Sequence, residues 1–579
     1  MILNDTISRV SRFVRESLQP ANVGPRRLLI ACMVVFAVAA GVRLLHWQNN
    51  WLTIDNTMNR TAAGYKKEAQ FLTDGDFRSF VRGSSTEPDT SLLTHTPGYP
   101  IFVAVTGLMT RNSTVALRLV HIALGAAAAV LVLLIAVELL PFAAAVVAGL
   151  FVAVSPQLSF YSIVLLPDSI VGIPLLLATY LLVLARKRPK AWKIFGAGVF
   201  IGISCWLRAD TLLLAPFLCL FIPVWFPRGL WWRYGALLVA AFVLAIAPIT
   251  IRNLVVFKSF IPLSLGTGHN LTTGIADYDP PKRFGLEPYD HTTSQQEAVM
   301  YNRPDYADDL YRPDGILRDR LRVGRAWVVI KSNKLWFMSV AARRAAKMLT
   351  YEPVAIISTE PSVSHPLDIN RGELAWQGES PGLNESATAI NVQPKSDYVL
   401  TVSLKSVADR MAIKIIRADT GKTLASASVP ESINPETIGT DGSTNLQIPF
   451  VNTSANQVKI AVLKLDQNPT NVGPIELYRL GPAAYVWTKY PRPVVKVLQK
   501  FFTTKWMFPL ALVGAILLVL ARRFEALAMI LAVPLYYISA HAPLHLELRY
   551  VLPIHYFWAM FVATSLYLMG EVAWKLLRR

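Results

Sequence analysis

Long apolar stretches, separated by short polar ones, fill the first half of this chain and return at its end. Ten of them approach the roughly 20 residues that a helix needs to cross a bilayer. They lie at 28–46, 115–139, 141–158, 166–185, 194–208, 211–227, 234–251, 506–521, 524–541 and 551–571. The pattern predicts a polytopic α-helical membrane protein with about ten or more transmembrane helices.

Basic residues orient these predicted spans, because Lys and Arg gather in cytoplasmic loops. Five basic clusters fall on one side of the membrane: the N-terminal arginines, Arg186–Arg188, Arg228 with Arg233, Arg522–Arg523, and Lys575–Arg579. The segments 47–114, 252–505 and 540–550 then face outward. No small-residue cleavage site follows the first apolar run, so we interpret that run as an anchor.

Two predicted helices lie in the first outer segment. RTAAGYKKEAQFLTDGDF, residues 60–77, has the pattern of an amphipathic helix. PGYPIFVAVTGLM, residues 97–109, is apolar but too short to span, and predicts a helix lying in the interface. A third helix, rich in Arg and Trp, is expected near 322–349 in the long outer segment.

Residues 366–484 change to strand-like patterns. Six short segments rich in β-branched residues, separated by Gly, Asn, Asp and Pro, predict a β-sandwich. They are YVLTVSLKSV, MAIKIIRAD, KTLASASV, NLQIPFVN, VKIAVLKLD and IELYRL. The pattern looks like a carbohydrate-binding-module jelly roll. A structural spacer and a sugar-binding domain both remain open, since fold alone does not establish function.

The chain is therefore expected to have three parts. Residues 1–365 form a transmembrane module with outer-loop interfacial helices, and residues 366–484 form an extracytoplasmic β-sandwich. Residues 485–579 add the C-terminal transmembrane helices that complete the membrane module.

Composition supports a membrane protein. Hydrophobic residues make up 53% of the chain and charged residues 16%, against about 25% charged in soluble domains. The net charge of +19 would suggest nucleic-acid binding in a soluble protein. Here many cations sit at span ends, where they determine topology. Cys32, Cys205 and Cys219 lie in apolar runs without zinc-ligand spacing, so packing is their expected role.

One segment carries the most information about function. Residues 247–274 read APITIRNLVVFKSFIPLSLGTGHNLTTG, in which an apolar helix leads into a polar, glycine-punctuated loop. The pattern P-x-T-x-R-N followed by G-x-N-L-x-x-G resembles polytopic GT-C glycosyltransferases. More narrowly, it is similar to the family 39-like branch of bacterial relatives of protein O-mannosyltransferases and of the aminoarabinose transferase of lipid A.

The resemblance implies two catalytic carboxylates. Asp55 in the first outer segment would be the general base, if an insertion displaces it from its usual place before Tyr65, where Thr61 now stands. Asp168 would lie in the active site and could bind a divalent metal ion, the one cofactor considered. The alternative for Asp168 is a helix N-terminal carboxylate stabilised by the helix dipole.

The resemblance also implies cations around a lipid phosphate. His95 precedes the P-G-Y-P element, and Arg208 follows the fifth span. Arg252 belongs to the P-x-T-x-R-N pattern, and Arg549 precedes the last span. Arginine offers a bidentate fork to phosphate oxygens. An interfacial structural histidine and an Arg208–Asp210 pair closing a tight turn are the structural alternatives.

The same resemblance implies that eight further residues contact the substrate. They are Tyr65, Asp76, Tyr99, Asn253, His269, Asn270, Glu547 and Tyr550. For Asp76 the residue pattern by itself favours a solvated helix terminus. Arg118, in ALRLVH, is family-like too, but a structural role is favoured.

The sequence thus predicts an inverting glycosyltransferase, a hexosyl- or pentosyltransferase, of a bacterial inner membrane, with its active site and β-domain facing the periplasm. Its donor would be a polyprenyl-phosphate monosaccharide, and its acceptor a glycolipid, polysaccharide or protein. Membrane lipids are the other expected partner, and nucleic acid is not. Two alternatives stay open: a transporter or flippase of lipid-linked saccharides, and a non-catalytic cell-envelope assembly protein. A transporter would need charges deep within several spans or an inverted repeat, and neither is seen.

Overall fold

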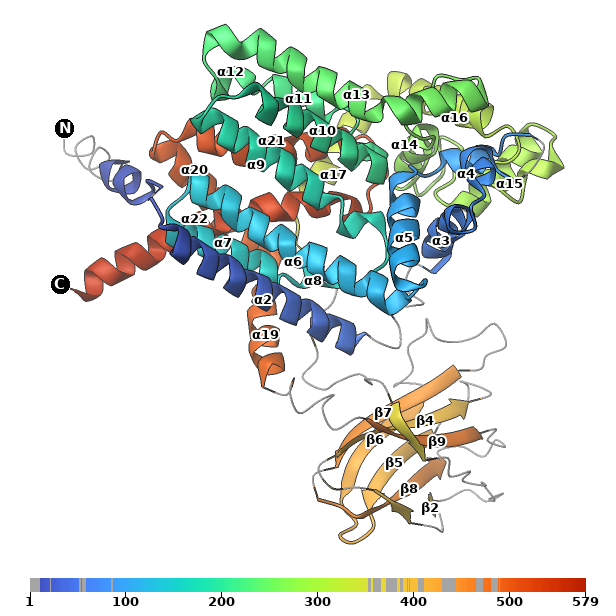
Figure 1. Cartoon of the computed structure of the whole chain (residues 1–579). Helices are drawn as coiled ribbons and strands as arrows, with labels where there is room; N and C mark the ends of the chain where they lie inside the picture. The colour runs from blue at the N-terminus through green and yellow to red at the C-terminus, as the bar shows by residue number, and fades with distance from the viewer. Residues whose placement is uncertain are drawn as a thin grey trace. The chain divides into compact units, whose positions relative to one another are not determined.

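The protein is described by a computed structural model (Figure 1). It describes residues 11–20, 22–50, 54, 59–84, 87–351, 356–357, 366–370, 383–385, 389–392, 394, 396–404, 411–429, 444–452, 454–464, 472–480, 488 and 490–578. The chain divides into two compact units. The first comprises 1–44, 56–356 and 498–579, and the second comprises 45–55 and 357–497. The domain boundaries expected from the sequence stay predictions.

Helices build the first unit. Its long apolar helices are α2 (Pro25–Asn49), α6 (Thr114–Leu139), α9 (Gly172–Lys187), α13 (Trp231–Phe257), α21 (Phe524–His541) and α22 (Leu552–Leu577). Shorter apolar helices are α5 (Gly98–Thr110), α7 (Phe142–Val154), α10 (Ala191–Leu207) and α20 (Thr504–Leu520). Six helical stretches of the described chain are long and apolar enough to cross a membrane, and the bent pair α19 (Pro491–Gln499) and α20 would add a seventh. The expected count of about ten crossings stays a prediction.

The sixth predicted span, 211–227, is not one continuous helix. The structure has two short helices there, α11 (Leu214–Cys219) and α12 (Ile222–Trp225). Pro223 explains the break, because it has no backbone N–H to donate to the carbonyl four residues earlier. The apolar residues of this segment predict burial or contact with lipid. Whether they form one continuous helix depends on which residues have a backbone N–H to donate.

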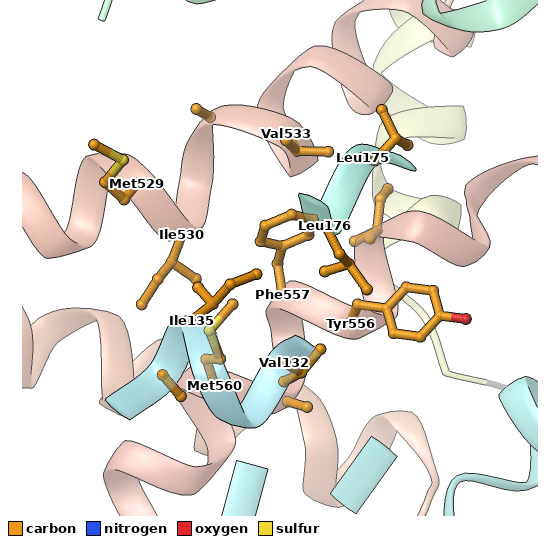
Figure 2. Close-up of a cluster of buried hydrophobic side chains, with 14 of the residues drawn as sticks. Val132, Ile135, Leu175, Leu176, Met529, Ile530, Val533, Tyr556, Phe557 and Met560 are labelled. Atoms are coloured by element: carbon orange, nitrogen blue, oxygen red, sulfur yellow. The ribbon is translucent and has the colours of Figure 1, made fainter. Parts of the chain in front are cut away.

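Small and branched side chains pack the helices together. In Figure 2, Val132 and Ile135 of α6 face Leu176 of α9 and Phe557 and Met560 of α22. All five are fully buried. A helix that buries one face and keeps apolar residues on the other is what a membrane environment permits. In α2, Leu29 and Met33 are 60% and 54% exposed although they belong to an apolar run.

Polar helices gather at one end of this unit, opposite the C-terminal end of α22 (Figure 1). They are α3 (Asn59–Thr73), α4 (Phe77–Arg82), α14 (Thr267–Ala276), α15 (Asp290–Met300) and α16 (Gly315–Ser332). The helix predicted in 60–77 is α3, and the one predicted in 97–109 is α5. The helix expected near 322–349 is in fact two, α16 and α17 (Lys334–Met348), which meet at Asn333.

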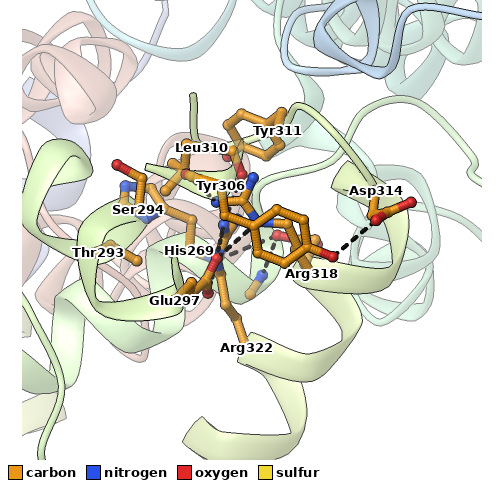
Figure 3. A network of polar contacts seen from close by, with 12 residues as sticks. His269, Thr293, Ser294, Glu297, Tyr306, Leu310, Tyr311, Asp314, Arg318 and Arg322 are labelled. Carbon is orange, nitrogen blue, oxygen red and sulfur yellow. Dashed lines mark hydrogen bonds and ion pairs between the residues drawn. The ribbon is translucent and has the colours of Figure 1, made fainter. Parts of the chain in front are cut away.

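A buried ionic cluster holds α15 to α16 (Figure 3). The Glu297 carboxylate receives Arg318 Nε at 2.9 Å and Arg322 Nη2 at 2.6 Å, and all three side chains are fully buried. Arg325 Nη2 adds a third contact at 2.5 Å. Arg318 also donates to the backbone carbonyls of Asp309 and Arg312, at 2.8 and 2.9 Å. One carboxylate thus organises the polar end of the unit.

The second unit is an antiparallel β-sandwich. One sheet has the order β1 (Pro366–Asn370), β9 (Val472–Leu480), β4 (Ser396–Leu404), β7 (Thr444–Asn452). The other has the order β2 (Leu383–Glu385), β8 (Gln457–Lys464), β5 (Met411–Arg417), β6 (Thr423–Val429), and β3 (Ile390–Asn391) also pairs with β8.

Alternating side chains fill the space between the two sheets. Leu400 and Val402 of β4 and Ile413 and Ile415 of β5 are buried in one apolar core. All six predicted strand segments are strands. The sequence missed β1, β2 and β3, because strands of two to five residues leave too short an alternation to detect.

Candidate active site

Asp168, Arg208 and Asp210 form a buried ionic triad where three helix ends meet. Pro167 starts the short 3₁₀ turn η2 (Pro167–Ser169) ahead of α9, and Asp168 follows it with its side chain only 2% exposed. Arg208 ends α10, and its Nη1 lies 2.6 Å from Asp168 Oδ1. Its Nε donates to Asp210 Oδ2 at 3.0 Å. A guanidinium held by two carboxylates is fixed in both position and orientation.

The loop before α22 closes the triad from another side. The guanidinium carbon of Arg208 lies 4.3 Å from the ring centroid of Tyr550, and that of Arg549 lies 5.1 Å from it. Glu547 accepts from the Tyr550 hydroxyl at 2.9 Å and pairs with Arg549. Two arginines therefore share one aromatic ring, which spaces their charges and orients them.

Tyr65, His95 and Tyr99 form an aromatic wall next to the triad. The ring of Tyr65 lies 4.5 Å from that of His95 and 5.0 Å from that of Tyr99. Burial raises the pKa of Tyr65 above its usual value, and the charges of Arg208 and Asp168 act on the same phenol. The Tyr65 hydroxyl is thus within electrostatic range of the triad and stays protonated at neutral pH.

His121, which the sequence did not single out, supports Asp168 from inside α6. Its Nδ1 lies 2.8 Å from Ser169 Oγ, and its Nε2 lies 3.2 Å from the Tyr99 hydroxyl. Ser169 Oγ donates to the Leu166 carbonyl, so it accepts from His121 Nδ1–H. Nε2 then accepts from Tyr99. These hydrogen bonds connect the η2 turn that carries Asp168 to the aromatic wall. The only signal of this role in the sequence was a lone histidine in an apolar helix.

Close packing of α5 against the end of α10 brings the wall to the triad. A Cβ at Gly98 would lie 2.4 Å from the Trp206 carbonyl oxygen, a backbone atom that cannot move aside easily. Only glycine permits this approach.

We expect Gly98→Ala to push α5 away from Arg208. The sugar transfer predicted from the sequence should then fall at least about tenfold, because small displacements of catalytic groups cost large factors in rate. Turnover and thermal stability of purified protein would be compared. Gly64→Ala, on α3, is the matched control, since a Cβ there has nothing within 4 Å. Equal activity of both variants would show that the α5–α10 approach does not set the site.

Two residues of the P-x-T-x-R-N pattern, Arg252 and Asn253, make hydrogen bonds to the backbone. Asn253 is fully buried, and its amide donates to the Ile261 and Leu263 carbonyls, both at 2.9 Å. This fixes the turn after α13. Arg252 donates to the Val81 carbonyl at 3.1 Å and to Asn253 Oδ1 at 3.2 Å. The structure therefore gives Asn253 a structural role, and its predicted substrate contact has no free amide N–H to use.

His269 and Asn270 open α14 and lie beside the loop that carries Glu547. His269 Nε2 lies 2.8 Å from Asp290 Oδ1, and this hydrogen bond lowers the pKa of Asp290. The Asn270 carbonyl accepts from the backbone N–H of His545 at 2.9 Å. A second bond, from His545 Nδ1 to Asp277 at 2.6 Å, raises the pKa of His545. These bonds anchor the 543–547 segment and so position Glu547.

One predicted residue, Asp76, stands apart from the triad. Asp76 is the N-cap of α4, where it accepts from Ser79 N–H at 3.0 Å, and those hydrogen bonds lower its pKa. The residue pattern around Asp76 favoured such a position at a helix terminus. Asp55, the predicted base, lies outside the described residues.

The described residues around Asp168 do not fit a metal site. No three His, Cys, Asp or Glu side chains of the described chain converge to hold an ion. The closest charged partner of Asp168 is the Arg208 guanidinium, which competes for the same carboxylate. We therefore assign no metal to Asp168.

Residues 94–251 match the family model for dolichyl-phosphate-mannose-protein mannosyltransferases. The matched segment, about a quarter of the chain, contains His95, Tyr99, His121 and the whole Asp168–Arg208–Asp210 triad. This match agrees with the glycosyltransferase resemblance that the sequence motifs carry. The six long apolar helical stretches of the described chain indicate an integral membrane protein.

Solved structures and curated proteins were compared with the chain as well. Two structures of the oligosaccharyltransferase AglB from Archaeoglobus fulgidus are similar, one with an inhibitory peptide and a dolichol-phosphate and one in the apo form. Both have TM-scores of 0.43, with identities of 13% and 12%, and both align over 94% of this chain. The alignments cover 51% and 52% of those structures, so the chain spans about half their length. No curated protein matches the sequence.

Proposed function

We propose that this protein transfers a monosaccharide from a polyprenyl-phosphate donor to an acceptor outside the cytoplasm, with inversion at the anomeric carbon. The observation that carries the proposal is the Arg208 guanidinium, buried between Asp168 and Asp210 and stacked on Tyr550. The family match includes the triad, and family members named in that match use a lipid-phosphate sugar. A bacterial inner membrane, with the site facing the periplasm, is part of the proposal.

Arg208 would hold the leaving phosphate. Among the described residues, Asp168 and Asp210 take two of its five N–H donors, so three remain for phosphate oxygens. Its side chain is 18% exposed, which leaves a limited approach from outside. A preorganised cation in a partly dry site stabilises charge that develops on the leaving group.

Arg549 would be the second phosphate ligand. It is paired with Glu547, whose side chain is 33% exposed and can turn towards solvent when an anion arrives. The two guanidinium charges of the site face three carboxylates, Asp168, Asp210 and Glu547. A phosphate therefore binds best by replacing Glu547 at Arg549, because Asp168 and Asp210 are more deeply buried. Arg252, whose charge interacts with that of Glu68, is a further candidate ligand.

The test is transfer by the purified full chain from a panel of synthetic polyprenyl-phosphate sugars. Total membrane lipids, glycans and proteins would serve as acceptors, and Asp168→Asn and Asp55→Asn would be assayed in parallel. Released polyprenyl phosphate together with a new glycoconjugate, lost in Asp168→Asn, is the expected result. Saturable donor binding without turnover would overturn the proposal and favour a transporter or an assembly protein.

A further inference from the structure

Exposed apolar side chains gather where α16 and α17 meet at Asn333. Trp327 and Val328, near the end of α16, are 54% and 65% exposed. Leu335 and Met338, at the start of α17, are 84% and 66% exposed. Two lysines stand between them along the chain. This set is called the junction patch and consists of Trp327, Val328, Lys331, Lys334, Leu335 and Met338.

The apolar side chains of the junction patch are not needed to pack the two helices. The opposite face of α16 carries Arg318 and Arg322, which point to Glu297 (Figure 3), and Ala326, which is buried in one apolar cluster with Ile275 of α14. α17 likewise buries its other face. The junction patch is therefore a second apolar surface. Single exposed apolar side chains are ordinary, but several together mark an interaction surface.

The charge of this segment has one sign. Residues 315–351 include nine Lys and Arg and a single acid, Asp319. Asp319 is buried and accepts hydrogen bonds from two backbone N–H groups at the start of α14. Lys331 Nζ lies 5.5 Å from the ring centroid of Trp327, and neither Lys331 nor Lys334 pairs with a carboxylate of the described chain. The junction patch is thus apolar and cationic, and it contains no acid.

α17 lies beside the ends of two apolar helices. The backbone N–H of Tyr351, just after α17, donates to Thr504 Oγ1 at 2.7 Å, and the N–H of Thr504 donates to the Tyr351 carbonyl at 3.0 Å. Thr504 begins α20. Arg344 of α17 donates at 3.2 Å to the carbonyl of Ala542, which follows the end of α21. The C-terminal half of α17 therefore lies at the membrane boundary, and its other end is about 20 Å away along the helix.

We propose that the junction patch docks on the surface of the bilayer and binds the phosphate groups of anionic phospholipids. Its four apolar side chains enter the region between head groups and acyl chains, where tryptophan is enriched. Lys331 and Lys334 reach the lipid phosphates while their aliphatic stems stay on the apolar surface. α17 then runs along the membrane surface.

A protein partner matches the junction patch less well. Lysine is depleted in protein–protein interfaces, whereas lysine beside tryptophan on an apolar helix face is typical of helices that lie in the membrane interface. The six long apolar helical stretches also keep a bilayer next to the chain at all times, while a protein partner has to be captured from solution.

Docking of the patch acts on the segment that carries Glu547. α16 holds the start of α14 through Asp319, whose Oδ1 accepts from the Gly268 N–H at 3.1 Å. The Asn270 carbonyl of α14 accepts in turn from the N–H of His545. A membrane contact of α16 and α17 thus steadies the 543–547 segment, whichever reaction the neighbouring site performs.

The first measurement is the depth of a nitroxide label at Leu335→Cys in the full chain, reconstituted in nanodiscs of zwitterionic and anionic phospholipids. Cys32 and Cys219 are replaced by Ala, and Cys205 is fully buried. We expect oxygen, which concentrates among acyl chains, to relax the label more strongly than a water-soluble nickel chelate does. Val299→Cys is the matched control, because Val299 is also 84% exposed but lies on α15, which has no Lys or Arg. Its label should respond mainly to the chelate.

The second measurement tests the lipid charge. A fluorophore on the same Leu335→Cys is quenched by nitroxide-labelled lipid that is either anionic or zwitterionic, and the anionic lipid should quench more. Lys331→Gln combined with Lys334→Gln should lower this preference at least about fivefold, because each lysine at an anionic surface contributes about that factor. Lys66→Gln combined with Lys67→Gln, two exposed lysines of α3, is the control and should leave the preference unchanged.

Three results would overturn the proposal. A label at Leu335 that is as accessible to the chelate as the label at Val299 would place the junction patch in water. A label protected from both oxygen and the chelate would mean that protein covers the patch. Equal quenching by the two lipids before any lysine is replaced would rule out binding of anionic head groups.

Discussion

Arg208→Leu is expected to abolish transfer and to destabilise the membrane unit. Asp168 would keep a carboxylate that is 2% exposed and has lost its cation. Breaking a buried pair by removing one partner costs about 3–5 kcal/mol, because the remaining charge is uncompensated. Loss of a preorganised cation at the leaving group should lower kcat by a further factor of about 100 to 1,000. Thermal unfolding in detergent and single-turnover transfer would measure the two effects.

A double variant separates these effects. Asp168→Asn combined with Arg208→Leu removes both charges, so most of the lost stability should return while transfer stays absent. Arg228→Leu, an exposed arginine at a helix start, is the control and should change neither quantity. Full activity in the double variant would show that the triad serves folding only.

Glu297→Gln should unfold the polar end of the helical unit at neutral pH. Arg318 and Arg322 would remain fully buried without a counter-charge (Figure 3). The expected cost is about 3–5 kcal/mol of local stability, as for other broken buried pairs. Hydrogen exchange and limited proteolysis of α15 and α16 would detect the opening. Transfer should fall with it, since α14 anchors the segment before Glu547.

The same network predicts a dependence on pH. Burial acts to raise the pKa of Glu297, but the hydrogen bonds and charges of Arg322 and Arg318 hold it below the usual value. A carboxyl whose pKa is lower in the folded state adds stability above its unfolded pKa, about 4.3, and loses it as pH falls further. Wild type should therefore weaken below about pH 4 and approach Glu297→Gln there.

Glu287→Gln is the control for this pair of expectations. Glu287 belongs to the same polar region but pairs with Lys282, whose side chain is 57% exposed. A surface pair of this kind contributes about 0–1 kcal/mol, so its removal should leave proteolysis unchanged. Equal behaviour of the two glutamine variants would mean that the buried network does not hold the region together.

Several candidate residues were predictable because their motifs lie at helix ends. Asp168, Arg208, Arg549 and Tyr550 are far apart in sequence, yet each starts or ends an apolar stretch on the predicted outer face. Helix ends on one membrane side must lie close together when the helices pack in parallel. The structure brings these four into one cluster, and their chemical roles stay proposals.

Other parts of the site could not be predicted. Asn253 shares the motif of Arg252, but its amide is used by two carbonyls eight and ten residues later. His121 belongs to no motif, and its importance comes from the side chains that it meets, Ser169 and Tyr99. A motif gives the residue type at a position; hydrogen-bond partners depend on how helices rotate against one another.

The sequence by itself determined the helical membrane module and the six longer strands, because apolar runs and alternation are local signals that a single segment carries. Tertiary structure alone decided which polar groups pair. Asp168 meets Arg208 across 40 residues, and Glu297 meets Arg318 across 21. A buried charge must find a partner wherever the packing places one, and no local pattern encodes that distance.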